Sequence, residues 1–495
     1  MPKKTTDNRT KRVPSAKGVT VRMYNTYFGD CFLLTFHDQD KKARYMLIDC
    51  GIHHEDERGR ARMQLVAKDI AEVTGNRLHI VTVTHEHTDH LYGFMYGEDI
   101  FKGIKIDELW LPWTEDPTNE TAKKLKESYG REIAALQAAI TRLKAAGSPL
   151  ATRLTSVLAF DSPPQTTPDI KGNSDILKFL RSKSDKAPEK PEDYRTPGET
   201  PIGLPNVKGV KIYVLGPPMD VQLIKKLVAA KEMYPRINAR AQGSDFAAAV
   251  IAAANTDASD TRAIDTLMPF DKSYGVSKQE ATIHPICKDF FQKHYGLGSK
   301  AKDGMEWRRI ENDWLNSADE LALSIQNMTN NTSLVLAIEL TETKPRKVLL
   351  FAADAQVGNW LSWQNIQWPE ANTNEKITGG DLLKRTVFYK VGHHGSRNAT
   401  LQQKGLEMMQ STELVAFISV DAEYAKSRGW SHPEPPIVER LEEKTRGRLI
   451  RSDEIPANDP PNKPEQISDN EWKAFTKNLT WDKSPNKLWI QYTIN

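Results

Sequence analysis

The sequence predicts an α/β protein in which short apolar strands alternate with amphipathic helices. Runs of apolar and β-branched residues, such as 79–84 and 333–340, have the length and composition of strands buried on both faces. Segment 62–75 instead places apolar residues at helical spacing and ends at Gly75, a residue suited to a helix C-terminus. Because strands and helices alternate, we expect a layered α/β core.

The predicted elements follow one another along the chain. We expect strands at 19–36, 43–51, 79–84, 107–113, 210–218, 333–340, 346–354, 385–395 and 413–421, and a closing strand in the terminal KLWIQYTI. The first of these is interrupted at Gly29 and Asp30. Helices are predicted at 62–75, 119–147 and 435–447.

Two segments interrupt this pattern within a single domain that spans 18–495. Residues 119–205 are predicted to form an insertion, made of the long helix and then a flexible loop rich in Pro, Lys and Ser. Residues 221–325 are Ala-rich and predict a helical insertion. Residues 1–17 carry six Lys or Arg and one Asp, which is typical of a disordered basic tail, or of a tail that binds an acidic partner.

Composition narrows the class of protein. The net charge of +3 is too small to indicate nucleic-acid binding by itself. No stretch approaches the roughly 18 apolar residues of a membrane span, and the N-terminus lacks the apolar core of a signal peptide. Three cysteines favour a reducing compartment, so we expect a cytoplasmic protein. Apart from the acidic partner that the basic tail could bind, the sequence identifies no protein partner.

Acidic or imidazole side chains follow four of the predicted strands, at the point where each strand ends. They are Asp49, His85, Asp354 and His393. In open α/β sheets, ligands bind outside the carboxyl ends of the strands. Imidazole and carboxylate groups are ligands that suit zinc, iron or manganese. We therefore expect one metal site assembled from distant segments.

The segment HEHTDH carries most of these donors. His85 and His87 alternate along an extended segment and can point the same way, whereas Asp89 and His90 can face a second position. One loop can therefore serve two metal ions, with Asp354 as the natural bridge between them. No GxSxG, Cys–His, Walker or GxGxxG pattern supplies a competing chemistry. We therefore expect water as the nucleophile, with Asp89 or Asp354 orienting it and taking its proton.

The segment THEHTDH matches the HxHxDH signature of the metallo-β-lactamase fold, and the chain resembles that superfamily. Asp49 in LIDCG, Asp354 in LLFAADA and His393 in VGHHGS match its other motifs in the expected order. The closer similarity is to the hydrolase domain of the bacterial competence protein for DNA internalisation and its soluble relatives, through FGDCFLLTF, NNTSLVL, VGHHGS and SHPEP. The resemblance covers 19–115, 208–220 and 328–450.

This resemblance implies an αββα sandwich with large inserted loops and a helical insertion. It also implies roles for the matching residues. It implies that His85 and His87 bind the first metal ion, that Asp89, His90 and His393 bind the second, and that Asp354 bridges the two. Asp49 would orient the histidine loop, and His394, Ser396 and His432 would contact the substrate. His393 is favoured over its neighbour His394 as the ligand because it directly ends the predicted strand, but the sequence leaves this choice open. The implied cofactor is one or two divalent metal ions, with zinc in first place and manganese or iron as alternatives.

One position departs from the family pattern. The superfamily usually has a further histidine for the first metal ion near the strand that here ends in VLGPP, where Gly216 and Pro217 stand. Either His284 or His294 reaches back from the inserted region, or water fills the position, or the first metal ion binds weakly.

The sequence therefore predicts a metal-dependent hydrolase. The resemblance favours a phosphodiesterase or nuclease acting on nucleic acid or nucleotides. Lys390 and Arg397 near the site agree with this substrate class, although both could equally be solvated charges. One alternative is the hydrolysis of another ester, a thioester or a lactam, because the fold hosts all of these. Another is a binding or regulatory module with a degenerate metal site.

Overall fold

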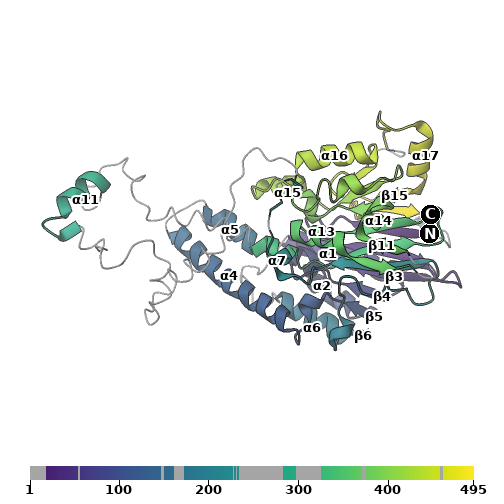
Figure 1. The fold of residues 1–495 in the computed structure, drawn as a ribbon, viewed down its shortest axis with the longest axis horizontal. Helices are drawn as coiled ribbons and strands as arrows, with labels where there is room; N and C mark the ends of the chain where they lie inside the picture. Colours follow the sequence, from purple (N-terminus) through teal and green to yellow (C-terminus); the bar gives the residue numbers. More distant parts are fainter. Residues whose placement is uncertain are drawn as a thin grey trace, which may run out of the picture. The chain divides into compact units, whose positions relative to one another are not determined.

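The computed structural model describes residues 18–53, 56–145, 150–160, 172–226, 228–229, 231–233, 282–296, 325–370, 375–456 and 461–495. The chain divides into two compact units. The first comprises Met1–Ala122, Phe160–Pro235 and Met328–Asn495, and the second comprises Lys123–Ala159 and Arg236–Asn327. The described strands and most of the described helices belong to the first unit (Figure 1).

The first sheet of this unit has eight strands in the order β15-β16-β1-β2-β3-β4-β5-β6. Their bounds are β1 Val19–Tyr24, β2 Phe32–His37, β3 Ala43–Ile48, β4 Arg77–Thr82, β5 Lys105–Trp110, β6 Ser184–Lys186, β15 Leu479–Trp481 and β16 Trp489–Ile494. Pairing is antiparallel from β15 to β3 and parallel from β3 to β6. The parallel strands β3 and β4 are therefore neighbours whose carboxyl ends share one edge of the sheet.

The second sheet has six strands in the order β14-β13-β12-β9-β8-β7. Their bounds are β7 Val210–Gly216, β8 Val335–Leu340, β9 Lys347–Phe351, β12 Thr386–Lys390, β13 Val415–Ile418 and β14 Leu449–Arg451. Strands β9, β12, β13 and β14 run parallel, and β7 and β8 are antiparallel. A separate pair joins β10 (Gln367–Pro369) to β11 (Lys376–Thr378).

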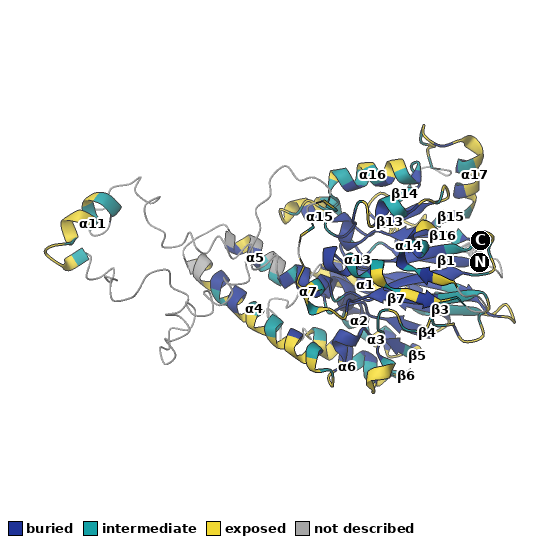
Figure 2. Cartoon of the chain, viewed as in Figure 1, coloured by how far each residue is buried: buried dark blue, intermediate teal, exposed yellow. Residues whose placement is uncertain are grey.

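The two sheets share a buried hydrophobic cluster, because residues from both contribute to it (Figure 2). Phe32 of β2 and Phe351 of β9 meet edge to face, with ring centroids 5.9 Å apart. A second cluster lies between the second sheet and its helices and includes the buried Trp360, Trp363 and Trp368. The first unit is thus a mixed α/β structure with more than one sheet.

The helices of the first unit pack against its strands or against one another. They are α1 Glu57–Thr74, α2 Thr88–Tyr96, α3 Glu98–Phe101, α6 Asn173–Lys183, α7 Val221–Ile224, α13 Val357–Ser362, α14 Gly379–Lys384, α15 Ala422–Ser427, α16 Pro435–Thr445 and α17 Asp469–Asn478. Helix α1 begins earlier than predicted, because the Asp56 side chain caps it by accepting a hydrogen bond from the Gly59 amide. It ends at Gly75 in the left-handed conformation, as predicted.

Helices α4 (Glu120–Ala145), α5 (Leu150–Leu158) and α11 (Lys288–Tyr295) lie wholly or mainly in the second unit. The long helix predicted at 119–147 is confirmed by α4. Much of the predicted helical insertion at 221–325 lies outside the described residues, and so does the basic tail at 1–17. In the described part of the chain, no helix has the length and apolarity that crossing a membrane requires.

The loop predicted before residue 205 is wrong for residues 173–186. Residues 173–186 form α6 and β6, and β6 pairs with β5 at the edge of the first sheet. Ile176, Leu177 and Leu180 of α6 are buried. Composition misled the prediction because tertiary packing of one apolar face, rather than intrinsic propensity, stabilises such a short helix. Residues 161–171 lie outside the described residues.

Candidate metal centre

The candidate centre lies at the carboxyl ends of two pairs of parallel strands, β3 and β4 in the first sheet and β9 and β12 in the second. The backbone turns sharply there. Asp49 after β3, Ala353 after β9, and His393 and His394 after β12 have positive φ angles of 56°, 48°, 43° and 51°. Such conformations are costly for residues other than glycine and cluster at functional sites. The turns aim polar side chains across the ends of the strands.

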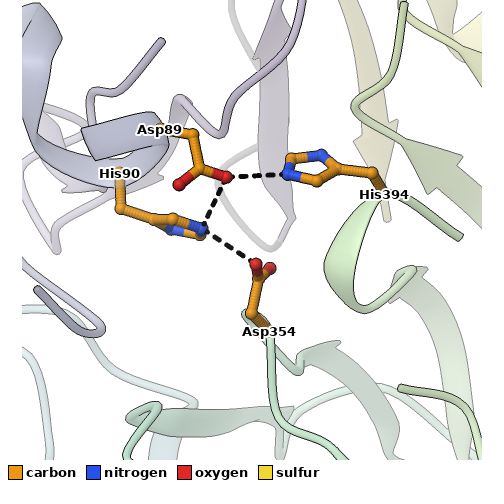
Figure 3. A group of neighbouring side chains, drawn as sticks. All are labelled: Asp89, His90, Asp354 and His394. Atoms are coloured by element: carbon orange, nitrogen blue, oxygen red, sulfur yellow. Dashed lines mark hydrogen bonds and ion pairs between the residues drawn. The ribbon is translucent and has the colours of Figure 1, made fainter. Parts of the chain in front are cut away.

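Four of these side chains form one compact buried group: Asp89, His90, Asp354 and His394 (Figure 3). The Nε2 atom of His394 lies 2.9 Å from Oδ2 of Asp89. The Nε2 atom of His90 lies 3.6 Å from the same Asp89 oxygen and 3.3 Å from Oδ2 of Asp354. All four side chains are at most 1% exposed. The group joins donors from α2 to donors that follow β9 and β12.

Hydrogen bonds from outside the group fix the direction of both imidazole rings. Nδ1 of His90 lies 2.7 Å from Oδ2 of Asp49, and Asp49 also accepts hydrogen bonds from the amide and hydroxyl of Thr84. Nδ1 of His394 donates to the backbone carbonyl of Ser419 at 2.7 Å. A ring whose Nδ1 carries the proton presents the lone pair of Nε2, and metal-binding histidines are usually held this way.

The atoms that face one another in this group fit a divalent cation. Within the described part of the chain, no hydrogen bond of normal geometry reaches Asp89 Oδ1, His90 Nε2 or Asp354 Oδ2, although all three are buried. A buried polar atom left in this condition is costly unless it binds something. Two carboxylates and two imidazoles are a donor set that suits zinc, manganese or iron.

The charges in the group are strongly coupled. Burial raises the pKa of Asp89, but His90 and His394 outweigh burial and hold the pKa of this carboxyl below its ordinary value. Burial likewise raises the pKa of Asp354, which His90, His393 and Lys390 lower well below its ordinary value. Burial lowers the pKa of His90, but the same two carboxylates raise it well above its ordinary value. The group therefore holds ionised carboxylates that require a positive charge beside them.

His85 and His87, predicted as ligands of a first metal ion, lie beside this group as a pair. Nε2 of His85 is 3.0 Å from Nδ1 of His87, and Nδ1 of His85 is 3.3 Å from the hydroxyl of Ser333. The usual third histidine has no room at Gly216. A Cβ atom there would lie 2.0 Å from Oδ1 of Asn359.

The structure brings His394, rather than His393, into the four-residue group, which differs from the predicted assignment. Nε2 of His393 lies 3.9 Å from Oδ2 of Asp354, and Nδ1 of His393 faces the amide of Gln356 at 3.2 Å. Burial lowers the pKa of His393 to about 4, so its ring is neutral near pH 7. The sequence favoured His393 because it directly follows the strand, but two consecutive positive φ angles reverse which ring points inward.

The two other predicted substrate contacts lie on the side of His393. The hydroxyl of Ser396 donates to Oδ1 of Asn398 at 2.6 Å, and the amide of Asn398 donates to Gln356 at 2.9 Å. Ser396 therefore belongs to a polar network that reaches the His393 ring. His432 is half-buried, and its ring centroid lies 5.2 Å from that of His393.

Lys390 is neither a solvated charge nor a basic surface group, which corrects the sequence interpretation. Its side chain is 2% exposed and forms ion pairs with Asp30 and with Oδ1 of Asp354, the latter at 3.4 Å. It also donates to the carbonyl of Ala353 at 2.9 Å. Burial lowers the pKa of Lys390, but Asp30 and Asp354 outweigh burial and raise it. Arg397 is half-buried.

Sequence reasoning missed several residues that support the centre. Asp30 stands in the quoted FGDC motif, and Ser333 stands in NNTSLVL. Asn331 of the latter motif accepts hydrogen bonds from the backbone amides of Gln356 and Asn359. The motifs that contain these residues could have pointed to them, but only the fold shows that the motifs lie beside the strand ends.

Aromatic side chains cover one side of His394. The ring of Phe28 lies 4.1 Å from that of His394, centroid to centroid, and Trp430 lies 5.4 Å from Phe28. The rings of Phe160 and His53 lie 4.0 Å apart, centroid to centroid, and are tilted by 40°. Phe28, Phe160 and His53 are each at most 3% exposed, so this side of the centre is shielded from bulk water.

Comparison with known families agrees with these donors. Residues 25–128 match the family model of the Metallo-beta-lactamase superfamily. The matched segment contains Asp49 and the whole HEHTDH segment, and it ends long before Asp354 and His394. A comparison with curated proteins gives no significant match. The match therefore supports a similarity to this superfamily for the segment that supplies the first-sheet half of the centre. It does not identify a branch of the superfamily.

Proposed function

We propose that the protein is a metal-dependent hydrolase whose centre is the group of Asp89, His90, Asp354 and His394. The observation that supports this proposal is the buried convergence of two carboxylates and two oriented imidazoles at the strand ends of two sheets. Members of the superfamily that matches residues 25–128 are generally metal-dependent hydrolases. We further propose that the two sheets and their outer helices form the four layers of an αββα sandwich, with insertions at 119–205 and 221–325.

Each residue of the centre has a proposed task. Asp89, His90, Asp354 and His394 would hold a divalent cation, for which zinc is the first candidate and manganese or iron are alternatives. The cation would supply Lewis acidity and a water nucleophile at neutral pH. Asp89 and Asp354, both ionised, would orient that water and accept its proton.

Other side chains keep the donors in place. Asp49 holds the ring of His90, and the carbonyl of Ser419 holds the ring of His394. Phe28 packs against His394 and excludes bulk water from that side, which strengthens the electrostatic interactions within the centre. His393, Ser396 and His432 are the proposed substrate-facing residues. The His393 ring is linked to Ser396 through Gln356 and Asn398, and it lies 5.2 Å from the ring of His432.

For the substrate, we propose a phosphodiester in nucleic acid or a nucleotide. The support is the similarity of four motifs to the competence branch, three of which contribute side chains at the centre: Asp30, Ser333 and His394. Lys390 no longer supports this substrate class, because its charge is used within the protein by Asp30 and Asp354. Another ester, a thioester or a lactam is the alternative substrate class.

The test is an assay of purified protein loaded with zinc or manganese. Substrates are single-stranded DNA, duplex DNA, RNA, cyclic nucleotides and a chromogenic phosphodiester, with a thioester and a β-lactam for the alternative class. His90→Ala should lower turnover by more than about 100-fold, since even residues behind the ligands change activity by about 10–100-fold. The matched control is His79→Ala, which removes a half-buried histidine from β4, before the strand end that leads to the centre.

Three outcomes would count against the proposal. If only the thioester or the lactam is hydrolysed, the protein is still a hydrolase, but its substrate is not a phosphodiester. A protein that binds metal but turns over none of these substrates would contradict the phosphodiesterase. Absence of both metal and turnover in a folded protein would favour a binding or regulatory module.

A further inference from the structure

Two adjacent asparagines before β8 have opposite surroundings. Asn330 and Asn331 are both fully buried. Asn331 uses its whole side chain: the amide nitrogen donates to two backbone carbonyls and the oxygen accepts from two backbone amides, at distances of 3.0, 3.2, 3.2 and 3.1 Å. Its amide is therefore occupied in holding the fold together.

The side chain of Asn330 has no comparable bonds. Within the described part of the chain, its Oδ1 has no hydrogen-bond partner. Its Nδ2 faces Nε2 of His393 at 3.5 Å, which is the outer limit of a hydrogen bond. A buried amide in this condition is costly unless it binds something. Asn330 therefore offers hydrogen-bonding capacity that the described residues do not use.

A series of side-chain hydrogen bonds decides what Nε2 of His393 offers. The hydroxyl of Ser396 donates to Asn398, whose amide donates to Oε1 of Gln356 at 2.9 Å. This bond leaves the amide nitrogen of Gln356 to face Nδ1 of His393, at 3.2 Å. Because an amide nitrogen only donates, Nδ1 of His393 accepts, and the ring carries a proton on Nε2.

Two donors therefore face each other beside Asp354 of the proposed metal centre. Nδ2 of Asn330 and Nε2 of His393 both carry hydrogen, so neither accepts from the other. Oδ2 of Asp354 lies 3.9 Å from Nε2, which is too long for a hydrogen bond. Turning the Asn330 amide by 180° would let Oδ1 accept from Nε2 and would leave Nδ2 open instead. In both orientations, the amide retains hydrogen for an acceptor that the described residues do not provide.

We propose that Asn330 and His393 bind a non-bridging oxygen of the phosphodiester beside Asp354. Two N–H donors that lie 3.5 Å apart can share one oxygen acceptor. Donors arranged in this way stabilise the negative charge that develops on such an oxygen in the transition state, and a buried site strengthens their effect. This inference rests on the proposed function and names two residues that orient its substrate.

The experiment measures the affinity for inorganic phosphate by isothermal titration calorimetry, on protein loaded with zinc and freed of unbound ions. Wild type should bind phosphate. Asn330→Ala should bind it about 10–100-fold more weakly, which is the size expected for one hydrogen bond to a charged group. Asn330→Asp keeps the shape of the side chain but adds a negative charge, so its affinity should be lower still. Elemental analysis should show unchanged metal content in both variants.

The matched control is Asn331→Ala, at the adjacent and equally buried asparagine. This change removes four hydrogen bonds and should lower the midpoint of thermal unfolding, whereas Asn330→Ala should unfold near the wild-type midpoint. If Asn330→Ala fails to fold, the isosteric Asn330→Asp provides the test.

The second donor is tested at His393. His393→Ala should weaken phosphate binding and keep the metal. His393→Gln should restore part of the affinity, because its amide nitrogen can donate in place of Nε2. Loss of metal in His393→Ala would make His393 a metal ligand and would overturn its role as a donor.

Turnover of the chromogenic phosphodiester separates this inference from the proposed function. Loss of one donor to the oxygen should lower kcat by about 100–1,000-fold in Asn330→Ala, without loss of metal. Wild-type phosphate affinity and turnover in this variant, or a loaded wild type that binds no phosphate, would overturn the inference alone. Phosphate binding that depends on Asn330 in a loaded protein without turnover refutes the hydrolase alone, and a folded wild type without metal refutes both.

Discussion

The two halves of the candidate centre are built in different ways. The half on the first sheet takes its donors from one short segment, HEHTDH, and a single carboxylate, Asp49, fixes the ring of His90. The half on the second sheet takes Asp354 and His394 from separate turns, and a backbone carbonyl fixes the His394 ring. A buried lysine balances the charge on this side. The comparison teaches that a local motif can specify one half, whereas long-range packing must assemble the other.

The largest effect is expected on the second-sheet side, at Lys390. Lys390→Met keeps the length of the side chain but leaves Asp30 and Asp354 without their buried cation. Removing one partner of a buried ion pair costs about 3–5 kcal/mol in the free energy of unfolding, which denaturant titration of the metal-free protein measures.

The control for this change is Lys347→Met on the neighbouring strand β9. Lys347 is 21% exposed, and its partner Glu413 is 63% exposed. A surface pair of this kind contributes about 0–1 kcal/mol. Equal losses in the two variants would show that Lys390 does not compensate a buried charge.

On the first-sheet side, Asp49→Asn should weaken metal binding. The change puts an amide in place of the carboxylate that accepts one hydrogen bond from Nδ1 of His90 and two from Thr84. We expect an affinity for zinc that is about 10–100-fold lower, measured by competition with a chelator. Asp107→Asn on β5 is the control. An unchanged affinity would mean that the first-sheet half does not depend on Asp49.

Gly216→Ala probes the position of the missing histidine. The added methyl group must displace the amide of Asn359, which holds the backbone of Asn331 and Ser333. Overpacking of this kind costs about 1–3 kcal/mol in the free energy of unfolding. Gly203→Ala is the control, because nothing lies within 4 Å of its added Cβ. A fully stable Gly216→Ala protein would reopen this position to a ligand.

The smallest effect is expected for Ser396→Ala. Loss of the hydrogen bond to Asn398 should lower stability by about 0.5–1.5 kcal/mol and leave the metal content unchanged. If Ser396 also contacts the substrate, KM should rise while the metal content stays the same. A loss of metal would place Ser396 among the groups that hold the cation, contrary to its position beside His393.

Much of the fold could be predicted from periodicity. Strands β3, β4, β9, β12 and β13 and helix α4 were predicted correctly, because the apolar pattern that indicates each of them lies within its own segment. Helix α6 and strand β6 were missed, since their surroundings are rich in Pro, Lys and Ser and their stability depends on packing against the first sheet. The strands β14 and β15 were also missed, because each has only three residues and so shows little periodicity of its own.

By itself the sequence determined the donors that chemistry requires: the spacing of HEHTDH, and a carboxylate or imidazole after each of four strands. Only the tertiary structure decided how they are used. It turned His394 rather than His393 towards Asp89, because consecutive left-handed residues and the Ser419 carbonyl set the ring direction. It also converted Lys390 from an apparent surface charge into a buried partner of two carboxylates. Both depend on groups that are distant in sequence and meet only when the two sheets pack.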